Sequence, residues 1–107
     1  MTTFNDRENA YENKYAHDRE LEFKINARRN KLVGLWAAEM MHMKQEDAEA
    51  YAKKLIMADI SQPGEDDVVS QVMEDFRKTG ISVTEKEVRE KMHIMLNMAR
   101  AQVQAQQ

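Results

Sequence analysis

Apolar residues recur at helical spacing through most of the chain, and this pattern predicts four helices. The stretches that carry it are residues 19–43, 46–59, 65 to about 78, and 85 onward. In each stretch the apolar positions lie three, four or seven residues apart, which places them on one face of a helix. We therefore expect an all-α chain whose four stripes pack together as a four-helix bundle.

The first and longest stripe has a glycine in its middle. The residues that we expect to form this stripe are Leu21, Ile25, Leu32, Trp36, Met40 and Met43. Gly34 lies among them, where a glycine costs roughly 1 kcal/mol relative to alanine. We expect that another element packs closely against Gly34, because such a contact would account for the glycine.

Turn and capping signals separate the last three helices. Residues 61–64 read Ser-Gln-Pro-Gly, which is typical of a turn. Gly80 suits the position just after a helix. Thr84 and Glu87 have the spacing of a capping box, in which each side chain bonds to the backbone of the other, so the fourth helix should start at Thr84.

The first 18 residues differ from the rest of the chain because they are polar and carry few bulky apolar side chains. Phe4, Tyr11 and Tyr15 would share one face of a helix, but this stripe is too thin to hold the segment folded in water. Asn9 and Asn13 weaken the helix further. We therefore expect a flexible N-terminal arm at residues 1–18 and a bundle at residues 19–107.

Composition agrees with a small helical protein. The chain has 107 residues, enough for one core, and only 3 glycines and 1 proline for turns. It has no cysteine, which excludes disulfides and thiolate chemistry. No apolar run approaches the roughly 20 residues of a membrane span, and the polar N-terminus does not resemble a signal peptide. The sequence therefore predicts a cytoplasmic protein without direct membrane insertion.

Charge is distributed unevenly along the chain. Residues 46–75 carry 9 acidic and 2 basic residues, a net charge of −7, although the whole chain has a net charge of −3. Because no concentrated basic face is evident, we expect no binding to nucleic acid. Arg28, Arg29 and Lys31 form a compact basic patch on the first helix. It is interpreted either as a solvated face that pairs with the acidic helices or as a docking patch for an acidic partner or an anion.

The chain contains few sequence patterns that are typical of catalytic or metal-binding sites. Two Glu-x-x-His pairs, Glu39–His42 and Glu90–His93, have the spacing used in di-iron bundles. Helical geometry turns Glu90 and His93 away from the apolar stripe of their own helix, so we expect them at the surface. No phosphate-binding glycine loop or nucleophile elbow occurs. The chain is therefore expected not to be an enzyme, with no catalytic residue and no metal site.

Several long stretches resemble one protein family. They are the N-terminal segment Met1–Ala10 with Lys14–Asp18, the 13-residue run Ala27–Glu39, and the segments Glu49–Lys53 and Gly64–Val68. These residues resemble the alphaproteobacterial zeta subunit, the inhibitor of the F-type ATP synthase, over nearly the whole chain.

The resemblance implies a four-helix bundle with an inhibitory N-terminal segment. Such a segment inserts into the catalytic head of the ATP synthase, between a catalytic and a non-catalytic subunit and beside the central rotor, and blocks ATP hydrolysis. The chain would then lie peripherally at the inner-membrane ATP synthase and be a monomer when free, without a resident cofactor.

The arm residues suggest how such insertion would work. A disordered arm orders when a partner supplies the missing apolar surface, and aromatic side chains commonly dominate such contacts. We expect Phe4, Tyr11 and Tyr15 to be the anchors. Asp6, Arg7, Glu8 and Lys14 would set the polar register.

The arm departs from the family pattern in two ways. Asn5, Asn9 and Asn13 replace charged or helix-favouring residues, and Tyr11 and Tyr15 stand where phenylalanine is common. Each asparagine raises the cost of helix formation by about 0.3–0.6 kcal/mol. A chain that docks but inhibits weakly is therefore one alternative that the sequence leaves open.

Two other functions compete with inhibition. The first is a sensor that binds ADP, ATP or another anion through Arg28, Arg29 and Lys31. The second is a general interaction module with a different partner.

Overall fold

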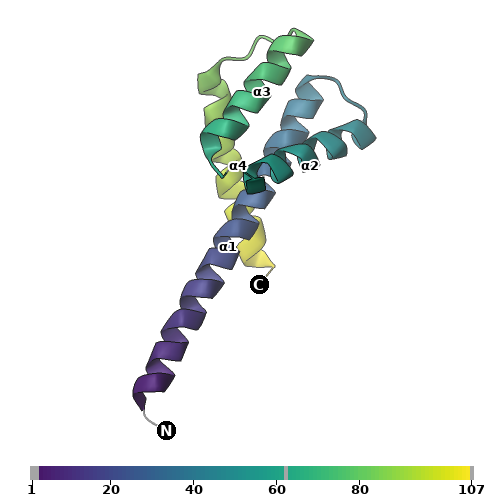
Figure 1. The fold of residues 1–107 in the computed structure, drawn as a ribbon. Coiled ribbons are helices and arrows are strands. Elements are labelled where there is room, and N and C mark those ends of the chain that lie inside the picture. The colour runs from purple at the N-terminus through teal and green to yellow at the C-terminus, as the bar shows by residue number, and fades with distance from the viewer. Residues whose placement is uncertain (1–2, 62, 107) are drawn as a thin grey trace.

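The computed structural model describes the backbone of residues 3–61 and 63–106, and the side chains of residues 17–61 and 63–106. Four helices follow one another: α1 Thr3–Met40, α2 Gln45–Ser61, α3 Glu65–Thr79 and α4 Glu85–Ala105 (Figure 1). No strand occurs among these residues. The predicted all-α, four-helix architecture is confirmed.

Helix α1 is longer at its start and shorter at its end than the apolar pattern indicates. It continues without a break through residue 18, and it ends at Met40 rather than Met43. At its end, His42 adopts a left-handed conformation with φ 59°, and the Met43 and His42 amides donate to the carbonyls of Ala38 and Glu39. This is a Schellman motif without glycine, so the sequence does not predict it.

The predicted caps of α3 and α4 are in place. Gly80 follows α3 with φ 75°, and the Ile81 amide donates to the Phe76 carbonyl in a second Schellman motif. At the start of α4, the Thr84 hydroxyl accepts a hydrogen bond of 3.2 Å from the Glu87 amide. These two signals in the sequence therefore fix the loop between α3 and α4.

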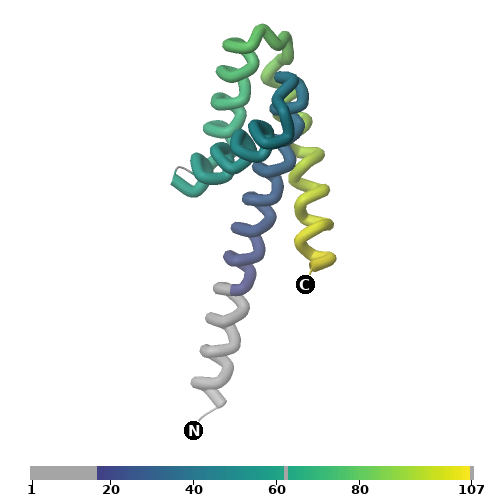
Figure 2. The backbone as a smooth tube through the Cα atoms, turned by 90° about the vertical axis from the view of Figure 1, so that its right-hand side faces the viewer, coloured from purple at the N-terminus to yellow at the C-terminus, as the bar shows by residue number. Residues whose placement is uncertain are grey.

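Helix α1 is the central element, and the other three gather around its C-terminal half. Both views show α2 crossing α1 at an angle, while α4 runs back alongside it (Figures 1 and 2). Helix α3 packs mainly between α2 and α4. Because α1 has neighbours on more than one side, its buried surface is wider than a single stripe.

The core consists of two clusters. The upper one joins all four helices, and its buried members are Val33, Ala37, Ala38, Tyr51, Leu55, Val68, Val69, Val72, Phe76, Val88 and Met92. Trp36 packs against it, with its ring edge-on to Phe76 at a centroid distance of 5.6 Å, and the Lys91 ammonium lies 5.7 Å from the Trp36 ring. The lower cluster joins α1 to α4 only, through Ile25, Ala99 and Val103.

The predicted stripe of the first helix is partly wrong. Met40 is exposed, whereas Arg29, Asn30, Val33 and Ala37 are buried although the stripe omits them. A single apolar stripe is expected when a helix packs against one neighbouring layer, but α1 packs against both α2 and α4. Small and polar residues therefore enter the interior where helices approach closely.

The expected close contact at Gly34 is confirmed. Gly34 is buried where α2 crosses α1. A Cβ atom at this position would lie 2.6 Å from the Ala52 Cα atom and 2.9 Å from its Cβ atom. The glycine is therefore required by the distance between the two helices.

Candidate partner-binding surface

The predicted anchors and polar residues of the arm lie outside the side chains that the structure describes. These residues are Phe4, Asp6, Arg7, Glu8, Tyr11, Lys14 and Tyr15, and their roles stay predictions. The structure does describe residues 17–24 of α1, which we name the arm root. His17 to Glu20 are exposed, and Ile25 is the first described residue that is fully buried. The arm root is therefore the point at which α1 leaves the bundle.

Helix α4 holds the arm root in place. Ile25 packs against Ala99 and Val103 in the lower core cluster. Just outside this contact, the Arg100 guanidinium donates to a carboxylate oxygen of Glu22 at 2.9 Å. The ion pair is partly exposed and adds little stability, so apolar packing supplies most of the hold. The direction in which α1 leaves the bundle is consequently set by the end of α4.

The structure does not bring the predicted basic patch together on one exposed face. Arg28 is half-buried and donates to the side-chain carbonyl oxygens of Gln102 and Gln106, at 2.9 and 3.5 Å. Lys31 is exposed, whereas Arg29 is only 7% exposed. Of the three residues, Arg28 and Lys31 are the two that border open surface.

Arg29 instead forms a polar contact inside the bundle. Its Nε atom donates to the Asn30 side-chain oxygen at 3.1 Å, and Asn30 is fully buried. The Asn30 amide nitrogen has no hydrogen-bond partner among the described residues. A buried amide without a partner destabilises the fold by about 1–3 kcal/mol. This pair lies on α1 between the residues of its two core clusters.

A groove runs along α1 beside the arm root, and we name it the root groove. It has a volume of about 310 Å³. The residues that line it come from α1, α2, α4 and the position just after α4: Phe23, Lys24, Ala27, Arg28, Lys31, Ile56, Val103 and Gln106. Phe23 is 55% exposed although it is aromatic. Sequence reasoning found Arg28 and Lys31 but missed Phe23, Lys24 and Ile56. The positions of Lys24, Arg28 and Lys31 at i, i+4 and i+7 are the signal that would have grouped the cations.

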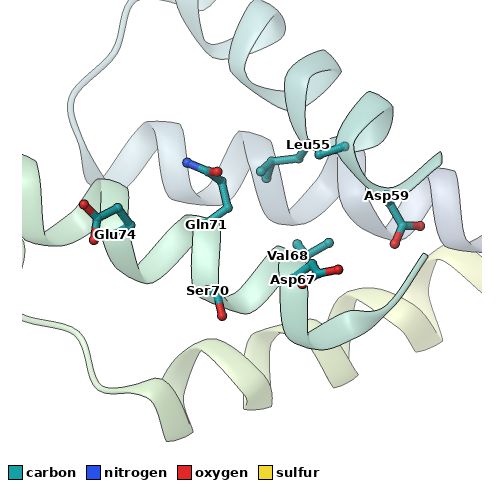
Figure 3. A pocket seen from close by; sticks show the side chains of 8 residues that line it. Leu55, Asp59, Asp67, Val68, Ser70, Gln71 and Glu74 are labelled. Carbon is teal, nitrogen blue, oxygen red and sulfur yellow. The ribbon is translucent and has the colours of Figure 1, made fainter. Parts of the chain in front are cut away.

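A second cavity, of about 430 Å³, lies between α2 and α3 and has acidic side chains at its edges (Figure 3). Asp59 and Glu74 stand at opposite ends of it. Asp59 accepts a hydrogen bond from the Gly64 amide, and Glu74 pairs with Arg77 at 2.6 Å, a contact that lowers the pKa of Glu74. These carboxylates therefore already have structural partners and do not converge on a common point.

A partly buried hydrogen bond joins α2 to α3 next to this cavity. The Tyr51 hydroxyl donates to a carboxylate oxygen of Asp75 at 2.7 Å, and the Gln71 amide donates to the same carboxylate. Burial, followed by the bond to Asp75 and its negative charge, raises the pKa of Tyr51 far above its ordinary value. Tyr51 thus remains a hydrogen-bond donor at any ordinary pH.

The Glu-x-x-His pairs lie on the surface. Glu39, His42, Glu90 and His93 are all exposed, as helical geometry predicted for the second pair. Within residues 17–61 and 63–106, no group of three or more histidine or acidic side chains has an arrangement that would hold a metal ion. None of the helices in the described part of the chain is long and apolar enough to cross a membrane.

The fold defines a small all-α protein built on one long helix, with a basic and apolar groove where that helix leaves the bundle. Residues 1–102 match the sequence model of a family described as ATPase inhibitor subunit zeta. The chain belongs to this family, which confirms the resemblance seen in the sequence.

A solved structure supports the fold. The chain is 37% identical to a protein whose structure was determined in solution by NMR, with a TM-score of 0.70. The similarity covers 81% of this chain and 99% of that one. A search of curated protein sequences gives no match.

Proposed function

We propose that this chain inhibits ATP hydrolysis by the F-type ATP synthase. The observation that carries the proposal is the family match over residues 1–102, because it spans the arm as well as the bundle. In this proposal residues 1–18 insert into the catalytic head, between catalytic and non-catalytic subunits and beside the rotor. The bundle stays outside, and the protein is held at the membrane only through the enzyme.

The structure supports a function in which the bundle positions the arm and the arm inhibits. Helix α1 is continuous from the arm root into both core clusters, so the arm root cannot turn relative to the bundle without bending a helix. Packing of Ile25 against α4 keeps this direction fixed. A bundle docked on the enzyme therefore fixes the point and the direction from which the arm starts, which reduces the entropy lost on insertion.

The proposal assigns the binding energy of the arm to its aromatic residues. Replacing Phe4, Tyr11 and Tyr15 together by alanine should raise the concentration needed for half-inhibition of hydrolysis by at least about a hundredfold, since aromatic anchors each contribute on the order of 1–2 kcal/mol or more. The assay is ATP hydrolysis by the isolated catalytic head of the cognate enzyme.

A matched control uses the asparagines of the same segment. Replacing Asn5, Asn9 and Asn13 by alanine alters three side chains of the arm but favours helix formation. This variant should inhibit as well as the natural chain or better. Equal inhibition by the aromatic triple variant and the natural chain would contradict the assigned role of the anchors.

The nucleotide-sensor alternative has less support. It needs Arg28, Arg29 and Lys31 around one anion, but Arg29 is buried and bonded to Asn30. The site would then consist of Arg28 and Lys31. Calorimetric titration with ADP and ATP tests it, and a measurable heat that disappears in a Lys31→Glu variant would favour it.

A further inference from the structure

We propose that the root groove is a docking site for an acidic segment with apolar side chains on the outside of the catalytic head. This inference rests on the proposed function and adds to it the surface that anchors the bundle and the chemistry of the partner. The charge of the groove, its apolar lining and its short distance from the arm support this proposal.

The groove carries three positive charges. Lys24, Arg28 and Lys31 line it, and no carboxylate does. Arg28 donates to the neutral amides of Gln102 and Gln106, so its charge is held in place but not neutralised. The three cations span two turns of α1, about 10 Å along the helix axis. An acidic segment would match this row along its length.

Neighbouring acids do little to cancel this charge. The Lys24 ammonium lies 3.7 Å from a Glu20 oxygen, and both side chains are more than half exposed, so the pair is weak. Within the part of the chain that the structure describes, no ion pair joins Lys31 to a carboxylate. The Lys31 ammonium is therefore available to a partner.

The groove also offers apolar surface. Phe23 is 55% exposed at its edge, and Ile56 of α2 and Val103 of α4 lie within it. Exposed aromatic rings and arginines are enriched in protein interfaces, and both are common among the residues that dominate binding. The partner should therefore carry at least one apolar side chain among its acidic residues.

The backbone around the groove favours a protein segment over a phosphate group. Most of its residues lie well inside helices, where the backbone amides are already bonded within the helix. Phosphate sites generally use free amides at helix N-termini or in glycine loops. This groove has only side-chain donors, which suit carboxylates spaced along a peptide.

The groove lies close enough to the arm to anchor it on a partner. Phe23 and Lys24 belong to both the groove and the arm root, and residue 18 lies only about 8 Å from Phe23 along the helix. A partner that surrounds the arm is therefore next to the groove. Docking here would hold the arm at the entrance of its binding site.

The test compares two double variants of the full-length chain in the hydrolysis assay. Phe23→Ala with Lys31→Glu removes the exposed ring and reverses one groove charge. The control, Met57→Ala with Lys54→Glu, makes the same kinds of change on α2: Met57 is also 55% exposed, and neither residue lines the groove. Circular dichroism checks the folding of both variants. We expect both to fold, because all four positions are exposed.

We expect the groove variant to raise the half-inhibitory concentration by at least about tenfold and the control by less than about twofold. Maximal inhibition at saturation should stay unchanged, because the arm is intact. Added salt should weaken inhibition by the natural chain more than inhibition by the groove variant.

The outcomes separate this inference from the proposed function. If the natural chain fails to inhibit, the proposed function is wrong. If it inhibits and the groove variant has the same half-inhibitory concentration as the control, only the groove inference is wrong. A changed molecular mass of the groove variant in solution with unchanged inhibition would identify a second copy of the chain as the occupant, and would also overturn the inference.

Discussion

The contact between Gly34 and Ala52 offers the most direct test of the fold. Gly34→Ala adds one methyl group where α2 crosses α1. The added carbon would lie 2.6 Å from the Ala52 Cα atom, whereas carbon atoms in contact lie at roughly 3.5 Å or more. The helices would have to separate by about 0.9 Å, the difference between these two values.

Two opposing effects set the size of the change. Forcing extra volume into a packed interior generally costs about 1–3 kcal/mol. Alanine also favours the helix by about 1 kcal/mol relative to glycine. Taking about 2 kcal/mol for the packing cost, we expect Gly34→Ala to lower the free energy of unfolding by about 1 kcal/mol, or the Tm by about 4 °C.

Urea and thermal unfolding followed by circular dichroism measure this change. Asn97→Ala, at an exposed position in α4, is the control for helix propensity and should be neutral or stabilising. Combining Gly34→Ala with Ala52→Gly should not restore stability, because the nearest atom is the Ala52 Cα, which glycine retains. A Gly34→Ala variant that is about 1 kcal/mol more stable than the natural chain, the full gain in helix propensity, would refute the close crossing of the two helices.

Further predictions concern three single residues. Thr84→Ala should lower the free energy of unfolding by about 1 kcal/mol in urea denaturation, because it removes the oxygen that caps the Glu87 amide. Gly80→Ala should cost about 1 kcal/mol in the same assay, because φ is 75° at this position. Tyr51→Phe should cost about 1–2 kcal/mol, because Asp75 loses the 2.7 Å hydrogen bond. Because the pKa of Tyr51 is raised in the folded chain, the unfolded chain loses the Tyr51 proton at a lower pH, and the free energy of unfolding should fall as pH rises above about 10. Unfolding measured at two alkaline pH values should show a smaller fall for Tyr51→Phe than for the natural chain.

Much of the fold follows from local patterns in the sequence. Capping and turn residues act within a few positions of themselves, so Thr84 and Gly80 placed the loop between α3 and α4 correctly. The buried residues of α2, α3 and α4 recur at helical spacing, so the apolar pattern predicted these helices. Gly34 was informative because a helical glycine is unfavourable unless something packs closely against it.

The buried surface of α1 was not predictable in the same way. A single stripe assumes one neighbouring layer, whereas α1 contacts both α2 and α4. Burial of Arg29 and Asn30 depends on where these helices cross, which no local pattern encodes. The end of α1 was missed because His42, not glycine, takes the left-handed conformation.

The candidate binding surface was predictable only in part. The basic run at residues 28–31 directed attention to the correct part of α1. Arg28 and Lys31 face the root groove and Arg29 does not, because positions one residue apart lie about 100° apart around a helix. Ile56 and Val103 come to the groove from distant parts of the chain, so the groove itself required the packed structure.

The central claim is that the arm inhibits and the bundle holds it. The most direct measurement is ATP hydrolysis by the isolated catalytic head with the full-length chain and with a chain of residues 19–107, whose folding is checked by circular dichroism. The account predicts inhibition by the full-length chain and none by the shortened chain. Equal inhibition by a folded chain without residues 1–18 would contradict it.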